Sequence, residues 1–494
     1  MTICRTRLFL QMKMKFKRPP LHELLNRWPL MGVMLAVSAA YAIYVIISFS
    51  GTGDSGDSIT HFQFARYAFK HPMNLMDSWA KPVFVLLAAP AAQFGFTGMK
   101  VFNVVLALLS ALMLQQILSH FRLLLAWMAI PFLFTMPLYF FMMFSGLTEY
   151  LFAFMLILAL WMVLKEHYWA AAVVISFLPF VRSEGYLILP CFALIFLMRK
   201  KFWPLSALFA GHLVYAVAGA AVFGEPLWMF TRNAYVAYSD EYGSGDCFHF
   251  FHQLPYVTGF PMSIFFGMAL LLLILVSLIP RLRRGQNELD ALWILAVAPF
   301  MLYFFAHVIF WKFGLFHSMG LKRVLLAVVP LMIIPVVWML NMFYTWISTR
   351  FKRLASLVVM LLFHAVVVFP FTDGPAAVHP ERDLMPDESQ MRAAQAAPLI
   401  AARAEYKAAG LLYCSHPYLK YLLDIDPFDR GTTRRLVDFA LEGPAHDRFL
   451  VIYDTEYGPV EDGLALESLL ARDDIELLEV LPDTSAGLRF YLFK

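Results

Sequence analysis

The sequence predicts an all-α polytopic membrane protein that carries a small soluble α/β domain at its C-terminal end. Of its 494 residues, 61% are hydrophobic and only 15% are charged, and the mean hydropathy is +0.66. These values are far from those of soluble proteins. Apolar runs long enough to cross a bilayer recur over residues 1–371. From residue 372 to residue 494 the apolar runs become short and polar segments separate them.

The apolar runs predict about eleven membrane crossings, which would pack into a helical bundle. They cover residues 29–50, 101–119, 124–145, 148–164, 169–181, 186–198, 203–223, 262–280, 290–311, 323–346 and 354–371. A further run, 82–97, is short and contains Pro90. We therefore expect this run to dip into the outer leaflet as a helix rather than to cross the membrane.

The basic residues between the runs predict the orientation of the bundle. Basic residues occupy 13–18 before the first run, and others follow later crossings at 199–201, 281–284 and 350–353. The positive-inside rule places all of these segments in the cytoplasm. The N-terminus would then be cytoplasmic and the C-terminal domain extracytoplasmic, in a protein of the inner (cytoplasmic) membrane. Because the net charge is only +4 and forms no basic patch, we expect no nucleic-acid partner.

The C-terminal segment, 372–494, has the pattern of a mixed domain. An alanine-rich stretch at 391–409 and the spacing of apolar residues at 464–470 predict helices, whereas 450–453 and 490–493 read as strands. The four cysteines show no metal-binding spacing. Cys247 and Cys414 both fall in predicted outer segments, so a disulfide between them is an alternative that the sequence leaves open.

The first outer loop carries Asp54, Asp57 and His61 beside the membrane, where charged groups are costly and usually functional. If a helix begins at Asp57 and runs through Lys70, His61 lies four residues on, over the same face. Asp57 could then act as a general base toward a hydroxyl group. Two other interpretations remain open. Asp57 could simply cap the helix, or Asp54, Asp57 and His61 could together bind a divalent cation.

Other charged residues occur where apolar runs begin on the predicted outer side. Lys81 precedes Pro82, so its ammonium group could contact a phosphate at headgroup depth, or could merely extend to the membrane interface. Arg182 and Glu184 form a charged turn between two crossings. They could contribute to the same site or could only pair with each other.

A third group, His317, Lys322 and Arg323, precedes the crossing at 323–346. Anions bind well at a helix N-terminus, although such residues also anchor helices at the interface. Because the topology places all of these groups on one face, we interpret them as substrate-binding residues of a site for an anionic lipid.

The order of these motifs resembles the GT-C glycosyltransferases, a group that includes protein O-mannosyltransferases and bacterial aminoarabinose transferases. The matching segments are Gly56-Asp57, the stretch from His61 to Tyr67, Lys81-Pro82-Val83-Phe84, Phe94-Gly95 and Val101-Phe102-Asn103. The resemblance covers residues 28–120. It departs from the family pattern at Ser58, where a second acidic residue is usual, and at Val83, where a second proline is usual.

The resemblance implies a GT-C-like fold and transfer of a sugar from a polyprenyl-phosphate donor. The acceptor would be a hydroxyl group of a glycan, a lipid or a protein at the outer face. It implies Asp57 as the catalytic base and Lys81 as a contact of the lipid phosphate. No cofactor is required, although a divalent metal is possible. Two alternatives are a transporter or flippase for a lipid or small anion, which would use the same charges, and a non-catalytic assembly protein.

Overall fold

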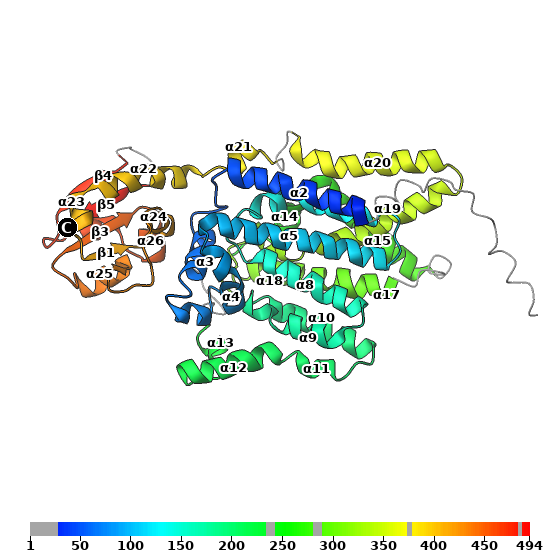
Figure 1. Cartoon of the computed structure of the whole chain (residues 1–494), viewed down its shortest axis with the longest axis horizontal. Helices are drawn as coiled ribbons and strands as arrows, with labels where there is room; N and C mark the ends of the chain where they lie inside the picture. The colour runs from blue at the N-terminus through cyan, green and yellow to red at the C-terminus, as the bar shows by residue number, and fades with distance from the viewer. Residues whose placement is uncertain (1–27, 234–242, 280–288, 373–377, 483–486) are drawn as a thin grey trace, which may run out of the picture.

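The computed structural model describes residues 28–233, 243–279, 289–372, 378–482 and 487–494, and shows a helical bundle with a small sheet-containing domain at one end (Figure 1). The predicted fold class is therefore confirmed. The basic stretches at 13–18 and 281–284 lie outside the described residues, so their predicted cytoplasmic placement stays a prediction.

Seven segments of the described chain are helical, apolar and long enough to cross a membrane. They are α2 (Trp28–Ser48), α5 (Gly95–His120), α11 and α12 (Pro204–Ala207 and Ala210–Phe223), α15 (Phe260–Leu278), α17, η4 and α18 (Leu289–Leu292, Trp293–Val297 and Ala298–Lys312), η6 and α19 (Val329–Met332 and Ile333–Ser348), and α20 and η7 (Lys352–Val368 and Phe369–Phe371). Each coincides with a crossing that the sequence predicts.

The other predicted crossings form shorter or interrupted helices. These are α8 (Glu149–Leu164), α9 and η3 (Tyr168–Ser176 and Leu178–Phe180), and α10 (Gly185–Met198). The run at 124–145 is not one helix but three: η2 (Ala126–Met128), α6 (Ala129–Phe134) and α7 (Pro137–Met142). Pro137 lacks an amide hydrogen and cannot continue α6, so it starts a new helix.

The loop that follows α2, which the sequence predicts to be the first outer loop, folds into short elements that lie against the bundle. They are α3 (Asp57–Arg66), η1 (Pro72–Met76) and α4 (Pro82–Ala92), while α13 (Trp228–Thr231), α14 (His249–Thr258) and η5 (Lys322–Ala327) belong to later loops. The helix predicted over 57–70 ends at Arg66. The short helix predicted over 82–97 is α4, which ends at Ala92 and packs against α3.

The C-terminal domain has a five-stranded sheet with the order β2-β1-β3-β5-β4. Its strands are β1 (Leu411–Cys414), β2 (Thr433–Arg434), β3 (Phe449–Asp454), β4 (Leu477–Leu481) and β5 (Phe490–Phe493). β1 pairs in parallel with β2 and β3, whereas β5 is antiparallel to β3 and β4. The two predicted strands correspond to β3 and β5.

Seven helices belong to the described part of 372–494. They are α21 (Pro380–Asp383), α22 (Glu388–Ala402), α23 (Ala404–Ala408), α24 (Pro417–Leu422), α25 (Leu436–Glu442), α26 (Tyr457–Glu461) and α27 (Leu466–Leu470). The first of them, α21, lies beside α2, and the others lie toward the sheet (Figure 1). The alternative of a disulfide is wrong, because Cys247 and Cys414 are both free thiols. Cys414 is buried on β1, where it packs as a small apolar side chain.

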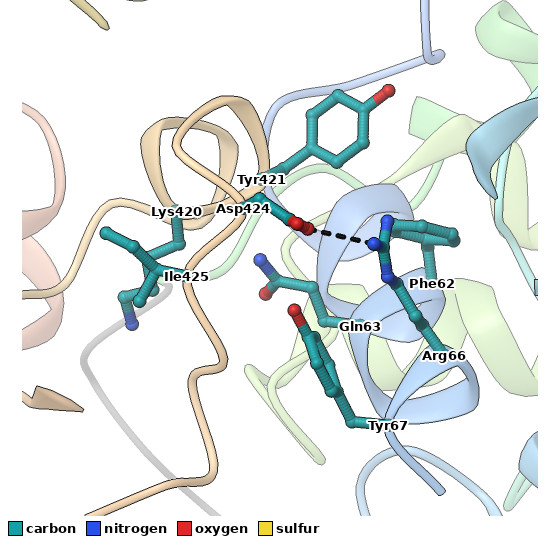
Figure 2. Close-up of a pocket in the computed structure, with 8 residues that line it drawn as sticks. All are labelled: Phe62, Gln63, Arg66, Tyr67, Lys420, Tyr421, Asp424 and Ile425. Atoms are coloured by element: carbon teal, nitrogen blue, oxygen red, sulfur yellow. Dashed lines mark hydrogen bonds and ion pairs between the residues drawn. The ribbon is translucent and has the colours of Figure 1, made fainter. Parts of the chain in front are cut away.

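The C-terminal domain packs against α3, as Figure 2 shows. Arg66 of α3 forms an ion pair with Asp424 at 2.8 Å, and Gln63 donates a hydrogen bond to the Pro417 carbonyl at 3.2 Å. The Phe62 ring meets Tyr421 edge to face, with 5.6 Å between ring centroids. The domain and the loop that follows α2 therefore lie at the same end of the bundle, which brings the domain next to Asp57.

Candidate active site

The loop that follows α2 presents two carboxylates to one guanidinium group. Arg323, at the start of η5, donates from Nη1 to Asp54 Oδ2 at 2.7 Å and from Nη2 to Asp57 Oδ2. The side chain of Arg323 is 15% exposed, whereas that of Asp57 is 44% exposed. Asp57 is thus oriented by a mostly buried cation while its carboxylate stays accessible to a substrate.

Asp54, and not Asp57, caps the start of α3. Its Oδ1 accepts the amide hydrogens of Gly56 at 3.0 Å and Ser58 at 2.8 Å. The interpretation of Asp57 as a mere helix cap is therefore wrong, because Asp57 is the first residue inside the helix and makes no such bond. Burial raises the pKa of Asp54, as does the adjacent Asp57 carboxylate, while Arg323 opposes this shift.

Ser58 explains why this loop departs from the family pattern. Its side chain is fully buried, donates to the Thr52 carbonyl at 2.5 Å and accepts the amide hydrogen of Gly146 at 2.7 Å. A carboxylate here would lose the donor and bring a charge into a buried position. Ser58 instead ties the loop to the chain that precedes α8.

His61 does not join the two aspartates. Its ring stacks on Trp79, with 4.6 Å between centroids, and only 7% of the residue is exposed. Burial lowers the pKa of His61 to about 3, so the ring is neutral, and its Nδ1 has no hydrogen-bond partner. His61 therefore packs beneath the site as an aromatic residue and forms no hydrogen bond with Asp57.

The three ligands predicted for a divalent cation do not come together either. Within the described ranges, no group of three histidine, cysteine, aspartate or glutamate side chains is arranged to hold a metal ion. The physical reason is that Arg323 occupies the space between Asp54 and Asp57 while His61 turns into the aromatic packing.

Lys81 is buried at the start of α4 and does not extend to the interface. It is 4% exposed, and its Nζ donates to the Ser78 carbonyl at 2.7 Å and to Ser183 Oγ at 2.8 Å. Burial lowers the pKa of Lys81 to about 8. Its backbone adopts a φ of 70°, a left-handed conformation that is unusual for a non-glycine residue and often marks a functional position.

Arg182 lies at the centre of a second charged cluster. It pairs with Glu184 at 2.7 Å, as the sequence allows, and with Glu149 at 2.7 Å. Although burial alone would raise the pKa of Glu184, the Arg182 guanidinium lowers it to about 2. Glu149 is missing from the residues predicted for the site. Its signal in the sequence is an acidic residue at the first position of the apolar run of α8.

His307 of α18 is absent from the predicted site, but its Nε2 lies 3.6 Å from Glu184 Oε1.

The remaining predicted residues are His317 and Lys322, and the structure places them differently from one another. His317 is partly buried in the turn before η5. Lys322 is exposed and holds its ammonium group 5.7 Å from the centre of the Tyr256 ring on α14. The structure therefore brings Arg323 into the cluster and directs Lys322 toward another helix.

The two clusters form one site at the end of the bundle that faces the C-terminal domain. Arg323 interacts electrostatically with Glu149 and Arg182 as well as with its own aspartates. The site combines mostly buried cations, which suit an anionic group, with one accessible carboxylate, which suits a proton acceptor. So many buried charges between apolar helices are costly unless they perform chemistry.

Comparisons with known proteins bear on the fold. No protein-family model matches the chain, and no curated protein matches it. Two solved structures do: ArnT from Cupriavidus metallidurans bound to undecaprenyl phosphate, with a TM-score of 0.60 at 12% identity, and the same protein in the apo state, with a TM-score of 0.59 at 11% identity. The alignments cover 93% and 94% of this chain and 97% of ArnT. The chain therefore has the fold of ArnT, and the GT-C-like fold predicted from the sequence is confirmed over nearly its full length.

Proposed function

We propose that this protein is a membrane glycosyltransferase that moves a sugar from a polyprenyl-phosphate donor to an acceptor hydroxyl group at the outer face of the cytoplasmic membrane. One observation carries the proposal: an accessible carboxylate, Asp57, is held by Arg323 beside the buried cations Lys81 and Arg182. The bound undecaprenyl phosphate in the ArnT structure supports a polyprenyl phosphate as the lipid.

In the proposed reaction, Asp57 accepts the proton of the acceptor hydroxyl group as its oxygen bonds to the anomeric carbon of the sugar. The bond between that carbon and the phosphate oxygen breaks on the opposite side, with inversion, and releases the polyprenyl phosphate. Negative charge grows on the leaving phosphate, and Lys81 and Arg182 stabilise it there. Arg323 holds the Asp57 carboxylate in its orientation through their ion pair.

The residues present do not fit a metal ion. Arg323 already occupies one oxygen of each aspartate, and His61 is stacked on Trp79. We propose that no cofactor is required. The test compares the rate of sugar transfer in three assays, with a chelator, with added Mg²⁺ and with added Mn²⁺. We expect the three rates to be equal.

The orientation follows from the same proposal. The site lies at the end of the bundle next to the C-terminal domain, so we place this domain outside the cytoplasm and the N-terminus inside. The acceptor, a glycan, a lipid or a protein, would approach from the aqueous side between the loop of Asp57 and this domain.

The test is donor consumption by the purified protein in lipid vesicles. The expected result is that a radiolabelled polyprenyl-phosphate sugar yields free polyprenyl phosphate and a glycosylated acceptor, and that the protein co-purifies with a prenyl lipid visible by mass spectrometry. The alternative of a transporter or flippase predicts movement of an intact lipid across the bilayer with no cleavage. A non-catalytic assembly protein predicts neither.

A further inference from the structure

The C-terminal domain reaches the loop of Asp57 with one side chain, Tyr457, at the first position of α26. A Cβ atom placed on Gly56 would lie 2.7 Å from the Tyr457 hydroxyl oxygen, so a larger residue at this position would push the phenol away. The Ser55 side chain forms a hydrogen bond with the phenol. Tyr457 thus contacts the two residues that directly precede Asp57.

The domain holds Tyr457 firmly from its own core. Asp454, a fully buried residue at the end of β3, accepts the amide hydrogens of Glu456 at 3.1 Å and Tyr457 at 2.6 Å. The buried His416 ring packs on the Tyr457 ring, with 4.9 Å between centroids. The orientation of the phenol toward the loop is therefore set by Asp454, at the end of β3, and by the buried His416 ring.

The phenol also has the right chemistry to restrain the loop. Burial raises the pKa of Tyr457 above its ordinary value, and the nearby Asp54 and Asp57 carboxylates raise it further. The hydroxyl group therefore stays protonated and can donate a hydrogen bond over the whole range in which an enzyme works.

Two other contacts from the same domain hold the preceding part of the loop. Gln390 of α22 donates to Thr52 Oγ1 at 2.7 Å, and the Leu384 carbonyl accepts the amide hydrogen of Gly51 at 2.9 Å. Thr52 Oγ1 in turn donates to the Asp54 carbonyl at 2.8 Å. These contacts fix where the loop leaves α2, and Tyr457 is the one that reaches the turn before Asp57.

We propose that Tyr457 is a positioning residue by which the C-terminal domain holds the loop 54–57, so that the Asp57 carboxylate keeps its orientation toward Arg323. This inference rests on the proposed glycosyl transfer and deepens it, because it gives the soluble domain a part in setting the catalytic carboxylate. Tyr457 acts through the loop and is not itself expected to touch the sugar.

The test uses Tyr457→Phe in the full-length protein, which removes only the hydroxyl group. The expected result is a fall in kcat of about 3- to 10-fold, the effect of losing one hydrogen bond near the reacting group. The KM for the donor should stay unchanged, because Lys81 and Arg182 are untouched. Tyr406→Phe, which removes a hydroxyl group from α23 in the same domain, is the matched control and should leave both constants unchanged.

A double-mutant cycle with Gly56→Ala separates positioning from a general loss of stability. The added methyl group clashes with the phenol oxygen in the wild type, but the next ring atom, Cζ, lies 3.7 Å away, an ordinary contact distance. Gly56→Ala should therefore reduce kcat strongly in the wild type and only slightly in Tyr457→Phe. Equal effects in both backgrounds would overturn the proposal.

Hydrogen exchange over residues 52–58 gives a readout that does not depend on transfer. We expect Tyr457→Phe to speed exchange of this segment several-fold while the bundle helices stay unchanged. Unchanged exchange in this segment would overturn the positioning role, even if Tyr457→Phe lowered the rate of sugar transfer. If the wild type transfers no sugar, the proposed function fails, whereas the exchange result still decides whether Tyr457 holds the loop.

Discussion

Arg323 and Asp54 are 269 residues apart in the chain, and Arg323 Nη1 donates to Asp54 Oδ2 at 2.7 Å. The same guanidinium group pairs with Asp57. Arg323 lies just before the crossing of η6 and α19, and only 15% of its side chain is exposed. Burying a cation is costly, so its pairing with two carboxylates indicates that these carboxylates have a task. The pairing orients Asp57 while its side chain stays 44% exposed.

Replacing Asp57 with Asn should abolish sugar transfer while membrane insertion and thermal stability stay normal. The amide keeps the shape of the side chain but cannot accept the acceptor's proton, a loss of roughly 100-fold or more in kcat. The measurement is initial rate in vesicles with the labelled donor. Asp429→Asn, a partly exposed carboxylate on the C-terminal domain, serves as the control. Full activity in Asp57→Asn would refute the assignment of the base.

Replacing Lys81 with Ala should weaken use of the donor. The ammonium group loses its interaction with the phosphate, and a charged hydrogen bond of this kind is worth about 1.5–3 kcal/mol, which corresponds to a rise of roughly 10- to 100-fold in the donor KM. Donor-concentration curves for wild type and variant measure this effect. Lys407→Ala, on the surface of α23, is the matched control, and an unchanged curve for Lys81→Ala would count against the phosphate contact.

The donor KM should depend on pH in one direction. Because burial lowers the pKa of Lys81 to about 8, the ammonium form is present below this pH and is lost as the pH rises through it. Donor affinity should therefore be constant up to about pH 7 and fall above about pH 8. Lys81→Arg should remove this fall, since a guanidinium group stays protonated. A wild-type curve that is flat to about pH 10 contradicts the prediction.

Glu149→Gln should destabilise the protein and reduce transfer together. Glu149 is 2% exposed in its side chain and pairs with Arg182, so the substitution leaves a mostly buried cation with Glu184 as its remaining carboxylate. We expect a loss of about 1–3 kcal/mol, seen as a lower Tm in detergent. Glu166→Gln, an exposed residue just after α8, should leave Tm unchanged. Equal Tm values for wild type and Glu149→Gln would show that the ion pair between Glu149 and Arg182 does not stabilise the protein.

Much of the bundle could be predicted because a membrane crossing depends on local composition. A run such as 101–119 must form all of its backbone hydrogen bonds within the helix and match the bilayer thickness. Its position can therefore be predicted from consecutive residues. The run at 124–145 failed as a single helix for an equally local reason, the proline at 137. The strands at 450–453 and 490–493 were predictable in the same way, from short apolar runs bounded by polar turns.

The membership of the site was harder to predict. Asp57, Lys81, Arg182 and Arg323 stand out because a charge beside an apolar run is unusual. Hydropathy could not tell that Lys322 would point to Tyr256, that His61 would stack on Trp79, or that Glu149 would pair with Arg182. Each of these outcomes depends on the rotamer and the neighbours that a particular packing provides.

The sequence by itself determined that this chain spans a membrane, where most of its helices lie, and that charged residues gather on one side, since burial of apolar length is a property of consecutive residues. Only the tertiary structure decided which charges meet, that His61 stays out of the cluster, and that Tyr457 of the C-terminal domain contacts Gly56. Those pairings join segments hundreds of residues apart, and their energies depend on distance and burial, which a linear pattern does not contain.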